Sequence, residues 1–469
     1  MYPVLNKARV RGGAGDFYLQ GTETGNEFVL EELHAQILWH CNGEHSLEWL
    51  SSNFFVTSED LRYFLDIIQG EGMLHFNDEA QKIDFPPLQK GPPLLEAQME
   101  ITGRCNLWCK HCYGRQDFKE VASQDLSLAE LLDFIDQASS MNISRCFLSG
   151  GEAFLRDDLP ELISYLAQKS ISIGGIFTNG TIYREDVIDA LRHNGVKATF
   201  LVSVDGPFSE IHDFVRGKGN FDKTVSFIKK TIDAGFRVTV NTVAMKQNVR
   251  HLMDMRQMLE RLGVSRWRIS VPREQGETIV NHEVIVPRWE EIFDAYKQLL
   301  LHTLGHPEGM KIQLSSIFKT EFLEEGKYYL YPEKSSCCEY KKYSLVLRPN
   351  GDILSCPASL NFPLGNIREK SLEEIWHSAL VQTFKTLPII ETECRDCRIR
   401  KYCGSGCRIS AWKAHNDFMA KDTNACPLYE FFAEVVEPIL REYGIEAEFL
   451  DEAKESKYDL SLLPKREIC

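Results

Sequence analysis

The 469-residue sequence predicts an α/β fold: a partial barrel of six βα units, a small module before it and a cysteine-rich region after it. Three observations support this prediction. Strand-like and helical patterns alternate between residues 94 and 272, whereas the first 77 residues run from short strands into three helices. Eleven of the fourteen cysteines fall in two regions, Cys105–Cys112 and Cys337–Cys426. Clustering of this kind favours metal binding over disulfides.

Charge and hydropathy exclude several classes of protein. The formal net charge of −15 argues against general nucleic-acid binding, which needs a basic face. No apolar run approaches the length of a membrane span, and the segment Met1–Lys7 lacks a signal-peptide pattern. We therefore expect a cytoplasmic protein that binds neither membrane nor nucleic acid.

Residues 1–77 form the predicted N-terminal module, and the polar, proline-rich residues 78–93 have the composition of a linker. We expect strands at 8–10, 17–19, 27–30 and 73–76 and helices at 31–41, 46–53 and 57–69. This order of elements resembles the PqqD-like winged-helix domain that binds the leader peptides of ribosomally made, modified peptides. The resemblance implies β-augmentation, in which an extended leader adds a strand to an open sheet edge. The alternatives are a structural cap and a protein-interaction wing.

The six predicted strands of the barrel (94–272) lie near 95–101, 144–149, 172–178, 198–205, 237–243 and 266–271. Ser127 and Glu130 form a capping box that begins one of the intervening helices. Gly195, Gly235 and Gly263 each follow a helical run, as glycines at helix C-termini do. In such a barrel the reactive residues lie at the carboxyl ends of the strands.

Cys105, Cys109 and Cys112 form a C-x3-C-x2-C pattern directly after the first barrel strand. They supply three ligands where a closed structural metal site has four. A zinc knuckle or unrelated thiols would be the alternative. The spacing, with an aromatic residue after the third cysteine, resembles the radical S-adenosylmethionine (radical SAM) enzymes. The resemblance implies a [4Fe–4S] cluster whose open iron binds SAM, and reductive cleavage of SAM to a 5′-deoxyadenosyl radical.

Further motifs follow the next strands. Ser149–Glu152 resembles the family's GGE motif, 178–180 its TNG motif, and 203–217 the SxDGP…HDxxRG stretch of its peptide-modifying members. Alone, Asp205-Gly206 would be a turn. Asn241, at the end of strand five, could face adenosine or substrate, or could be a satisfied strand-end residue. The residues expected to bind SAM are Gly150, Gly151, Glu152, Asn179, Ser203, Arg216 and Asn241.

The second group of cysteines, in residues 336–430, resembles the SPASM domain of radical SAM maturases. It contains a C-x2-C-x5-C-x3-C run and departs from the family pattern in a longer final spacer and a doubled first cysteine. The resemblance implies two auxiliary [4Fe–4S] clusters, and whether the first keeps an open iron is undecided. The expected ligands are Cys356 and Cys407 with Cys337 or Cys338 for the first cluster, and Cys394, Cys397, Cys403 and Cys426 for the second. Zinc held by four thiolates is the alternative.

Residues 273–335 are expected to bridge these domains with mixed helix and loop. Residues 431–469 are expected to begin as an amphipathic helix that packs on the SPASM region and to end in a polar tail. Cys41, Cys146 and Cys469 fit no ligand spacing.

Together these resemblances imply a radical SAM enzyme that oxidatively modifies a precursor peptide bound through its leader. An external one-electron donor of flavodoxin or ferredoxin type would reduce the cluster bound by Cys105, Cys109 and Cys112. We expect a thioether crosslink from a cysteine sulfur to carbon, and the residue that acts as general base is not identified. The alternatives are a carbon–carbon crosslink, cysteine or serine oxidation as in sulfatase maturation, a non-catalytic iron–sulfur electron-transfer scaffold, and an iron–sulfur regulator that binds DNA through the wing.

Overall fold

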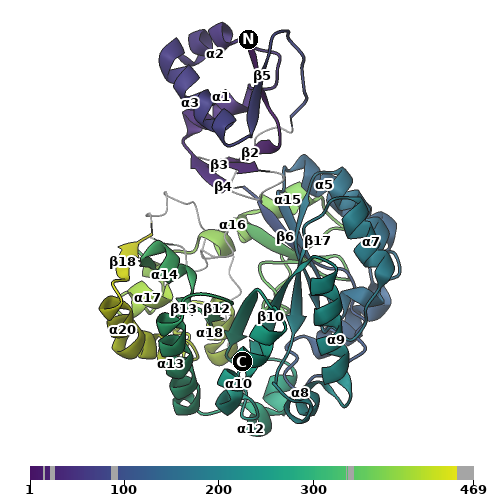
Figure 1. Cartoon of the computed structure of the whole chain (residues 1–469), viewed down its shortest axis with the longest axis vertical. Coiled ribbons are helices and arrows are strands. Elements are labelled where there is room, and N and C mark those ends of the chain that lie inside the picture. The colour runs from purple at the N-terminus through teal and green to yellow at the C-terminus, as the bar shows by residue number, and fades with distance from the viewer. Residues whose placement is uncertain (14–15, 22–26, 86–92, 334, 336–342, 451–469) are drawn as a thin grey trace.

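The computed structural model describes residues 1–13, 16–21, 27–85, 93–333, 335 and 343–450 (Figure 1). Cys337, Cys338 and Cys469 therefore lie outside the described residues. Among the described residues, no helix combines the length and the apolar character needed to cross a bilayer.

The N-terminal module forms a separate lobe at one end of the molecule (Figure 1). It contains a three-stranded antiparallel sheet in the order β2-β3-β4, three helices, and a pair formed by β5, which the sequence predicted, and β1, which it did not. Ser46 and Thr57 begin the second and third helices, because each side chain accepts a hydrogen bond from the first-turn backbone. The elements are β1 (Tyr2–Leu5), β2 (Ala8–Gly13), β3 (Asp16–Gly21), β4 (Glu27–Leu30), α1 (Glu32–Trp39), α2 (Leu47–Phe54), α3 (Ser58–Gly70) and β5 (Leu74–Asn77).

The main sheet has six parallel strands at its centre, and they follow one another in sequence order. These strands confirm the six expected from the sequence: β6 (Glu96–Glu100), β7 (Arg145–Ser149), β8 (Ser172–Thr178), β9 (Thr199–Ser203), β10 (Arg237–Val243) and β11 (Arg266–Ser270). The helices between them are α4 (Arg115–Val121), α5 (Leu128–Ser140), α6 (Leu159–Gln168), α7 (Glu185–His193), α8 (Ser209–Arg216), α9 (Asn220–Asp233) and α10 (Leu252–Arg261). The capping box of Ser127 and Glu130 is present at the start of α5.

Both edges of this sheet carry strands that the sequence did not predict. At one edge β12 (Lys311–Leu314) pairs parallel with β11, followed by β13 (Phe318–Lys319). At the other edge β15 (Ser344–Leu347) pairs parallel with β6. The 273–335 bridge is thus not only helix and loop, because it completes one sheet edge. Its remaining elements are α11 (Glu277–Val280), α12 (His282–Ile285), α13 (Trp289–Gly305), α14 (Glu321–Glu325) and β14 (Lys327–Leu330).

The C-terminal region continues from β15 into the cysteine-rich segment and ends in a helix interrupted by a π-helical turn, 432–436. Phe432 packs against Tyr328 and Tyr402, and Glu437 accepts a hydrogen bond from Tyr402 at 2.6 Å. These contacts confirm that the helix packs on the cysteine-rich region. The elements are β16 (Asp352–Leu354), β17 (Gly365–Asn366), α15 (Leu372–Trp376), α16 (Ala379–Thr386), α17 (Arg400–Cys403), α18 (Arg408–His415), α19 (Cys426–Phe431), α20 (Glu437–Glu442) and β18 (Glu446–Phe449).

One hydrophobic core joins the parallel sheet to the C-terminal region, since it contains Leu148 of β7 together with Leu345, Trp376 and Phe432. The N-terminal module has a core of its own. Arg11 of β2 links the module to the sheet, because its buried guanidinium donates to Asn142, which precedes β7, at 2.7 Å. The parallel sheet and the C-terminal region are therefore a single packed unit, to which the N-terminal lobe is joined by polar contacts at this point.

Candidate active site

The loop after β6 carries Cys105, Cys109 and Cys112 to the wall of one cavity of about 690 Å³. This cavity lies at the carboxyl ends of the parallel strands, as expected for a βα architecture. Six of the seven residues predicted to bind SAM line it: Gly150, Gly151, Asn179, Ser203, Arg216 and Asn241. Folding thus brings together motifs that are separated by more than a hundred residues in the sequence.

Cys109 and Cys112 are partly buried, and Cys105 is exposed. Partial removal from water raises the pKa of each thiol, that of Cys109 to about 12. Arg216 opposes this effect, because its Nη1 lies 3.8 Å from the Cys109 sulfur. Among the described residues no three His, Cys, Asp or Glu side chains converge on a single ion. The thiolates of an iron–sulfur cluster each bind a different iron, so three cysteines on one cavity wall fit such a cluster.

Asp205 holds Arg216 in place beneath these thiols. Its carboxylate is fully buried, accepts from Arg216 Nε at 2.6 Å and from the Val243 backbone at 2.9 Å, and lies 3.5 Å from His111 Nε2. Burial alone would raise the pKa of Asp205, but the guanidinium and then His111 lower it below its usual value. The pair therefore stays charged in the core, and the aspartate fixes the direction in which the guanidinium points.

Two buried histidines border this ion pair. His111 belongs to the cysteine loop, and His212 of α8 accepts from the Asp205 backbone at 3.3 Å through Nδ1. Burial lowers the pKa of His111 and that of His212, each to about 4. Both imidazoles are therefore neutral at neutral pH, and the guanidinium is the charged group closest to Cys109.

Glu152, the remaining predicted SAM contact, does not line the cavity. Its side chain is 1% exposed and accepts hydrogen bonds from Thr178 Oγ1 at 2.8 Å and from the Asn179 backbone at 2.7 Å. Burial raises the pKa of Glu152, and these hydrogen bonds oppose the change. In this arrangement Glu152 ties the GGE turn to the TNG turn. A direct contact with SAM stays a prediction.

Asn106, which the sequence analysis did not single out, connects the cysteine loop to the same TNG turn. Asn179 Nδ2 donates to Asn106 Oδ1 at 2.9 Å, and Asn106 Nδ2 donates to Thr181 at 2.9 Å. These bonds position the loop relative to strand β8, and Asn179 thus orients the loop as well as lining the cavity.

Glycines allow two close approaches of the backbone to the cysteine loop. A Cβ atom on Gly150 would lie 2.4 Å from the carbonyl oxygen of Thr102. A Cβ atom on Gly276 would lie 2.5 Å from the carbonyl oxygens of Cys112 and Tyr113, and Gly276 has a φ of +57°. The bridge thus packs its backbone directly on the third cysteine of the loop.

Replacing Gly276 with alanine is expected to displace residues 112 and 113 and to lower iron bound at this loop. The strained φ and the overlap together should reduce the free energy of unfolding by about 2 kcal/mol. Iron content after anaerobic purification and chemical unfolding measure the two effects. Gly305→Ala is the matched control, because a Cβ there meets nothing within 4 Å. Equal iron content in G276A and G305A would contradict the prediction.

A second buried ion pair, also not predicted, lies where β6 meets β15. Glu100, at the end of β6, is 1% exposed, and its carboxylate lies 3.4 Å from Arg348 Nε. Burial raises the pKa of Glu100 to about 7, although Arg348 opposes the change. Because β15 precedes the cysteine-rich segment, this pair connects the cavity strand to that segment.

The described cysteines of the C-terminal region form two groups. Cys356 and Cys407 pack against the same small apolar cluster, which includes Ile389 and Phe418. Burial raises the pKa of Cys403 to about 12, and proximity to the thiols of Cys394, Cys397 and Cys426 adds to this increase. Cys356 and Cys407 thus belong to one of the two expected ligand sets and the other four cysteines to the second, and cluster binding by either set stays a prediction.

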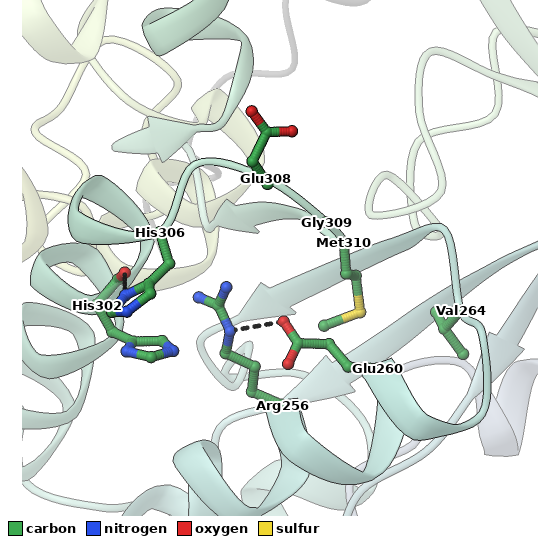
Figure 2. Close-up of a pocket in the computed structure, with 8 residues that line it drawn as sticks. All are labelled: Arg256, Glu260, Val264, His302, His306, Glu308, Gly309 and Met310. Atoms are coloured by element: carbon green, nitrogen blue, oxygen red, sulfur yellow. Dashed lines mark hydrogen bonds and ion pairs between the residues drawn. The ribbon is translucent and has the colours of Figure 1, made fainter.

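A second cavity of about 370 Å³ lies at the amino ends of the strands, opposite the first (Figure 2). It is bordered by His302 and His306 of the α13 end, and by Arg256, which forms an ion pair with Glu260 at 2.9 Å. None of the residues predicted to function from sequence lies here. Residues at this end of such a sheet usually contribute to stability.

The comparisons with known proteins agree with this site. Residues 99–259 match the model of the radical SAM superfamily, and residues 337–398 match that of an iron–sulfur cluster-binding domain, SPASM. The first match contains all three loop cysteines and the strand-end motifs of the cavity. The chain therefore contains a radical SAM domain and a SPASM iron–sulfur domain, and it is an enzyme.

Characterised relatives of the chain act on different substrates. It is 28% identical over 340 residues to the AdoMet-dependent heme synthase of Methanosarcina barkeri, covering 69% of this chain and 93% of that protein. It is 26% identical over 342 residues to the PqqA peptide cyclase of Granulibacter bethesdensis, covering 72% and 88%. The structure of Streptococcus suis SuiB bound to its precursor peptide SuiA matches with a TM-score of 0.68 at 16% identity, over 90% of this chain and 99% of SuiB.

Proposed function

We propose that this enzyme modifies a ribosomally made precursor peptide, most simply by forming a thioether crosslink between a cysteine sulfur and a carbon of the peptide. The observation that carries the proposal is the convergence of three cysteines and the strand-end motifs on one cavity, in a chain that also has a separate N-terminal module of small sheets and three helices. The similarity to a peptide cyclase and to the peptide-bound fold of SuiB supports a peptide substrate.

The cavity residues bind, orient and enclose the reactants. When bound, the cluster supplies the electron that splits SAM into methionine and a deoxyadenosyl radical. Arg216 presents positive charge to the thiolates and to the carboxylate of SAM. Ser203 and Asn241 offer polar groups at neighbouring strand ends, and Gly150 and Gly151 leave room for a ligand against the backbone. The cavity walls exclude water and other hydrogen donors from the reactive carbon.

The N-terminal module offers the edge of β4 to a leader peptide. β4 is the last strand of its sheet, and among the described residues only β3 pairs with it. Its Val29 is 82% exposed, so this edge presents an apolar side chain to solvent. An extended leader that pairs with β4 would cover Val29 by β-augmentation. The alignment with SuiB over 90% of the chain extends into the first 93 residues, and so supports a common fold there.

The cysteines of the C-terminal region would hold two auxiliary clusters, the first with Cys337 or Cys338 as a further ligand. Joining sulfur to carbon removes two hydrogens from the peptide. One leaves as an atom with the deoxyadenosyl group, and the second leaves as a proton and an electron. Cys356 and Cys407 lie in the region whose strand β15 pairs with β6, so an electron acceptor held there would be close to the substrate cavity. An external flavodoxin- or ferredoxin-type donor would supply the first electron.

The test uses a candidate precursor peptide with its leader, sought among short reading frames encoded near this gene. We expect incubation with enzyme, reductant and SAM under anaerobic conditions to remove two hydrogens per crosslink and to consume free thiol. Deleting the leader should abolish the reaction. Intact mass and thiol alkylation measure both outcomes. The same mass loss with thiols untouched would instead indicate a carbon–carbon link. A cysteine or serine oxidised without a crosslink would indicate sulfatase-type chemistry.

Two matched variants test the role of the module. Val29→Asp should weaken leader binding about tenfold, because it places a charge on the surface that the leader covers. Phe55→Asp is the control: Phe55 is 95% exposed in the same module, at the end of α2 and away from β4 (Figure 1). Equal binding by both variants would show that the leader binds elsewhere. SAM cleavage with the peptide unchanged would point to another substrate, and the heme synthase relative makes tetrapyrroles the first class to examine.

A further inference from the structure

The walls of the active-site cavity carry an excess of positive charge, although the whole chain has a formal charge of −15. None of the lining residues, in the described part of the chain, carries a carboxylate. The five lining cations are Arg104, Arg115, Lys119, Arg216 and Arg273. Glu152 and Asp205, two acidic residues near the cavity, are buried behind its wall.

Two of these cations already have partners within the protein. Arg216 is paired with Asp205 and directed at Cys109. Arg104 lies 3.8 Å from Asp125 and donates to the Leu155 carbonyl at 3.3 Å. Their charge is largely offset, and Arg216 is further needed for the thiolates. The unbalanced positive charge of the cavity therefore comes from the other three lining cations.

The other three cations are available to a ligand. Arg115 stacks on the Trp108 ring and donates to the Leu107 carbonyl, but its buried Nε has no hydrogen-bond partner. The side chains of Lys119 and Arg273 form no ion pair or hydrogen bond in the described structure, and the Lys119 ammonium lies 6.0 Å from the centre of the Trp108 ring. Asp117, Glu120 and Glu274 are near these residues in sequence, yet none of them lines the cavity.

We propose that these three cations select a peptide whose segment beside the reacting carbon carries aspartate or glutamate side chains. This inference rests on the proposed function and adds the chemistry of its substrate. In a partly enclosed cavity a carboxylate is attracted more strongly than in open water, and a cationic segment is repelled. The leader would supply affinity through the wing, and the cavity charges would supply selectivity for the acidic segment.

The test compares three fluorescein-labelled versions of the candidate precursor peptide sought near this gene. All have the same leader. One has its natural core, one has every core Asp and Glu changed to Asn and Gln, and one has them changed to Lys. Binding to full-chain enzyme loaded with clusters and SAM is measured by anisotropy. We expect the amide core to bind about fivefold more weakly than the natural core, and the lysine core more weakly still. The difference should shrink at high salt.

Variants of the enzyme test whether the cavity cations cause the difference in affinity between the natural and amide cores. Lys119→Gln combined with Arg273→Gln should bring the affinity ratio between the natural and amide cores close to one. Lys229→Gln is the matched control, because Lys229 is an exposed lysine on the outer helix α9. Lys229→Gln should leave the affinity ratio between the natural and amide cores unchanged.

The outcomes separate this inference from the proposed function. A natural core without acidic residues, or equal affinity for all three cores, would overturn the charge selection while crosslinking could still proceed. A ratio that survives in the double variant would also overturn it. Failure of every peptide to bind or to change mass, with SAM still cleaved, would overturn the peptide substrate itself and with it the acidic segment.

Discussion

Replacing Cys109 with alanine is expected to abolish SAM cleavage, with a loss of rate of at least about 10³-fold, because the cluster loses one of its three protein thiolates. Cys109 is the cysteine toward which the Asp205–Arg216 pair is directed, and no other described thiol lines the cavity besides Cys105 and Cys112. No other described thiol of the cavity is therefore free to replace Cys109 as a ligand of the cluster. Iron per chain should fall by about four, the content of one cluster.

Cys146→Ala is the matched control for this loss. Cys146 is a free cysteine in β7 that is fully buried among apolar side chains. Its removal should cost about 1 kcal/mol of stability and leave iron content and SAM cleavage unchanged. Deoxyadenosine formation measured by chromatography, together with iron analysis, distinguishes the two variants. Substantial SAM cleavage by C109A would contradict the assignment of the loop as the cluster site.

Replacing Asp205 with asparagine is expected to lower the free energy of unfolding by about 3 kcal/mol, since it leaves the Arg216 guanidinium buried without its counter-ion. It should also reduce SAM cleavage, because the guanidinium loses the partner that directs it to Cys109. Urea unfolding of the protein measures the first effect. The double variant Asp205→Asn with Arg216→Gln should cost less than the sum of the single variants.

The pair of Asp186 and Arg184, in which the carboxylate is exposed, is the control for this prediction. Asp186 is 55% exposed, so Asp186→Asn should change stability by less than about 1 kcal/mol.

The contribution of Asp205 to stability depends on pH, and its sign follows from the direction of the pKa shift. Because the folded-state pKa of Asp205 is lowered, its contribution is complete above the unfolded value, about 4, and is lost as pH falls through the folded value. A D205N protein as stable as wild type at neutral pH would contradict the structural role of the pair.

Local patterns made much of this protein predictable. The six parallel strands follow from the alternation of short apolar runs with helical periodicity, and the helix beginning at Ser127 follows from its capping box. The cysteine spacings predict both metal regions, because the ligands of a tight loop must be close in sequence. Motifs at strand ends could be assembled into one site before the structure was known, since parallel strands place their carboxyl ends at a common edge.

Other features depend on contacts between residues far apart in the sequence. Nothing local marks residues 344–347 as the strand that pairs with β6, because a parallel partner is chosen by packing and hydrogen bonding across the whole fold. Asp205 could be interpreted as a turn residue until Arg216 and His111 were found around it. The role of Glu152 in tying the GGE turn to the TNG turn became visible only when its oxygens were found to bond Thr178 and Asn179.

By itself, then, the sequence determined the class of chemistry: three loop thiols, a glycine-rich turn and a row of strand ends, each defined by residues that are neighbours in the chain. The tertiary structure alone decided which charges face the reactants. Arg115, Lys119 and Arg273 meet at one cavity only because the cysteine loop, α4 and the end of β11 fold together there. The sign of a cavity's charge is a sum over residues brought close in space, and no local pattern contains that sum.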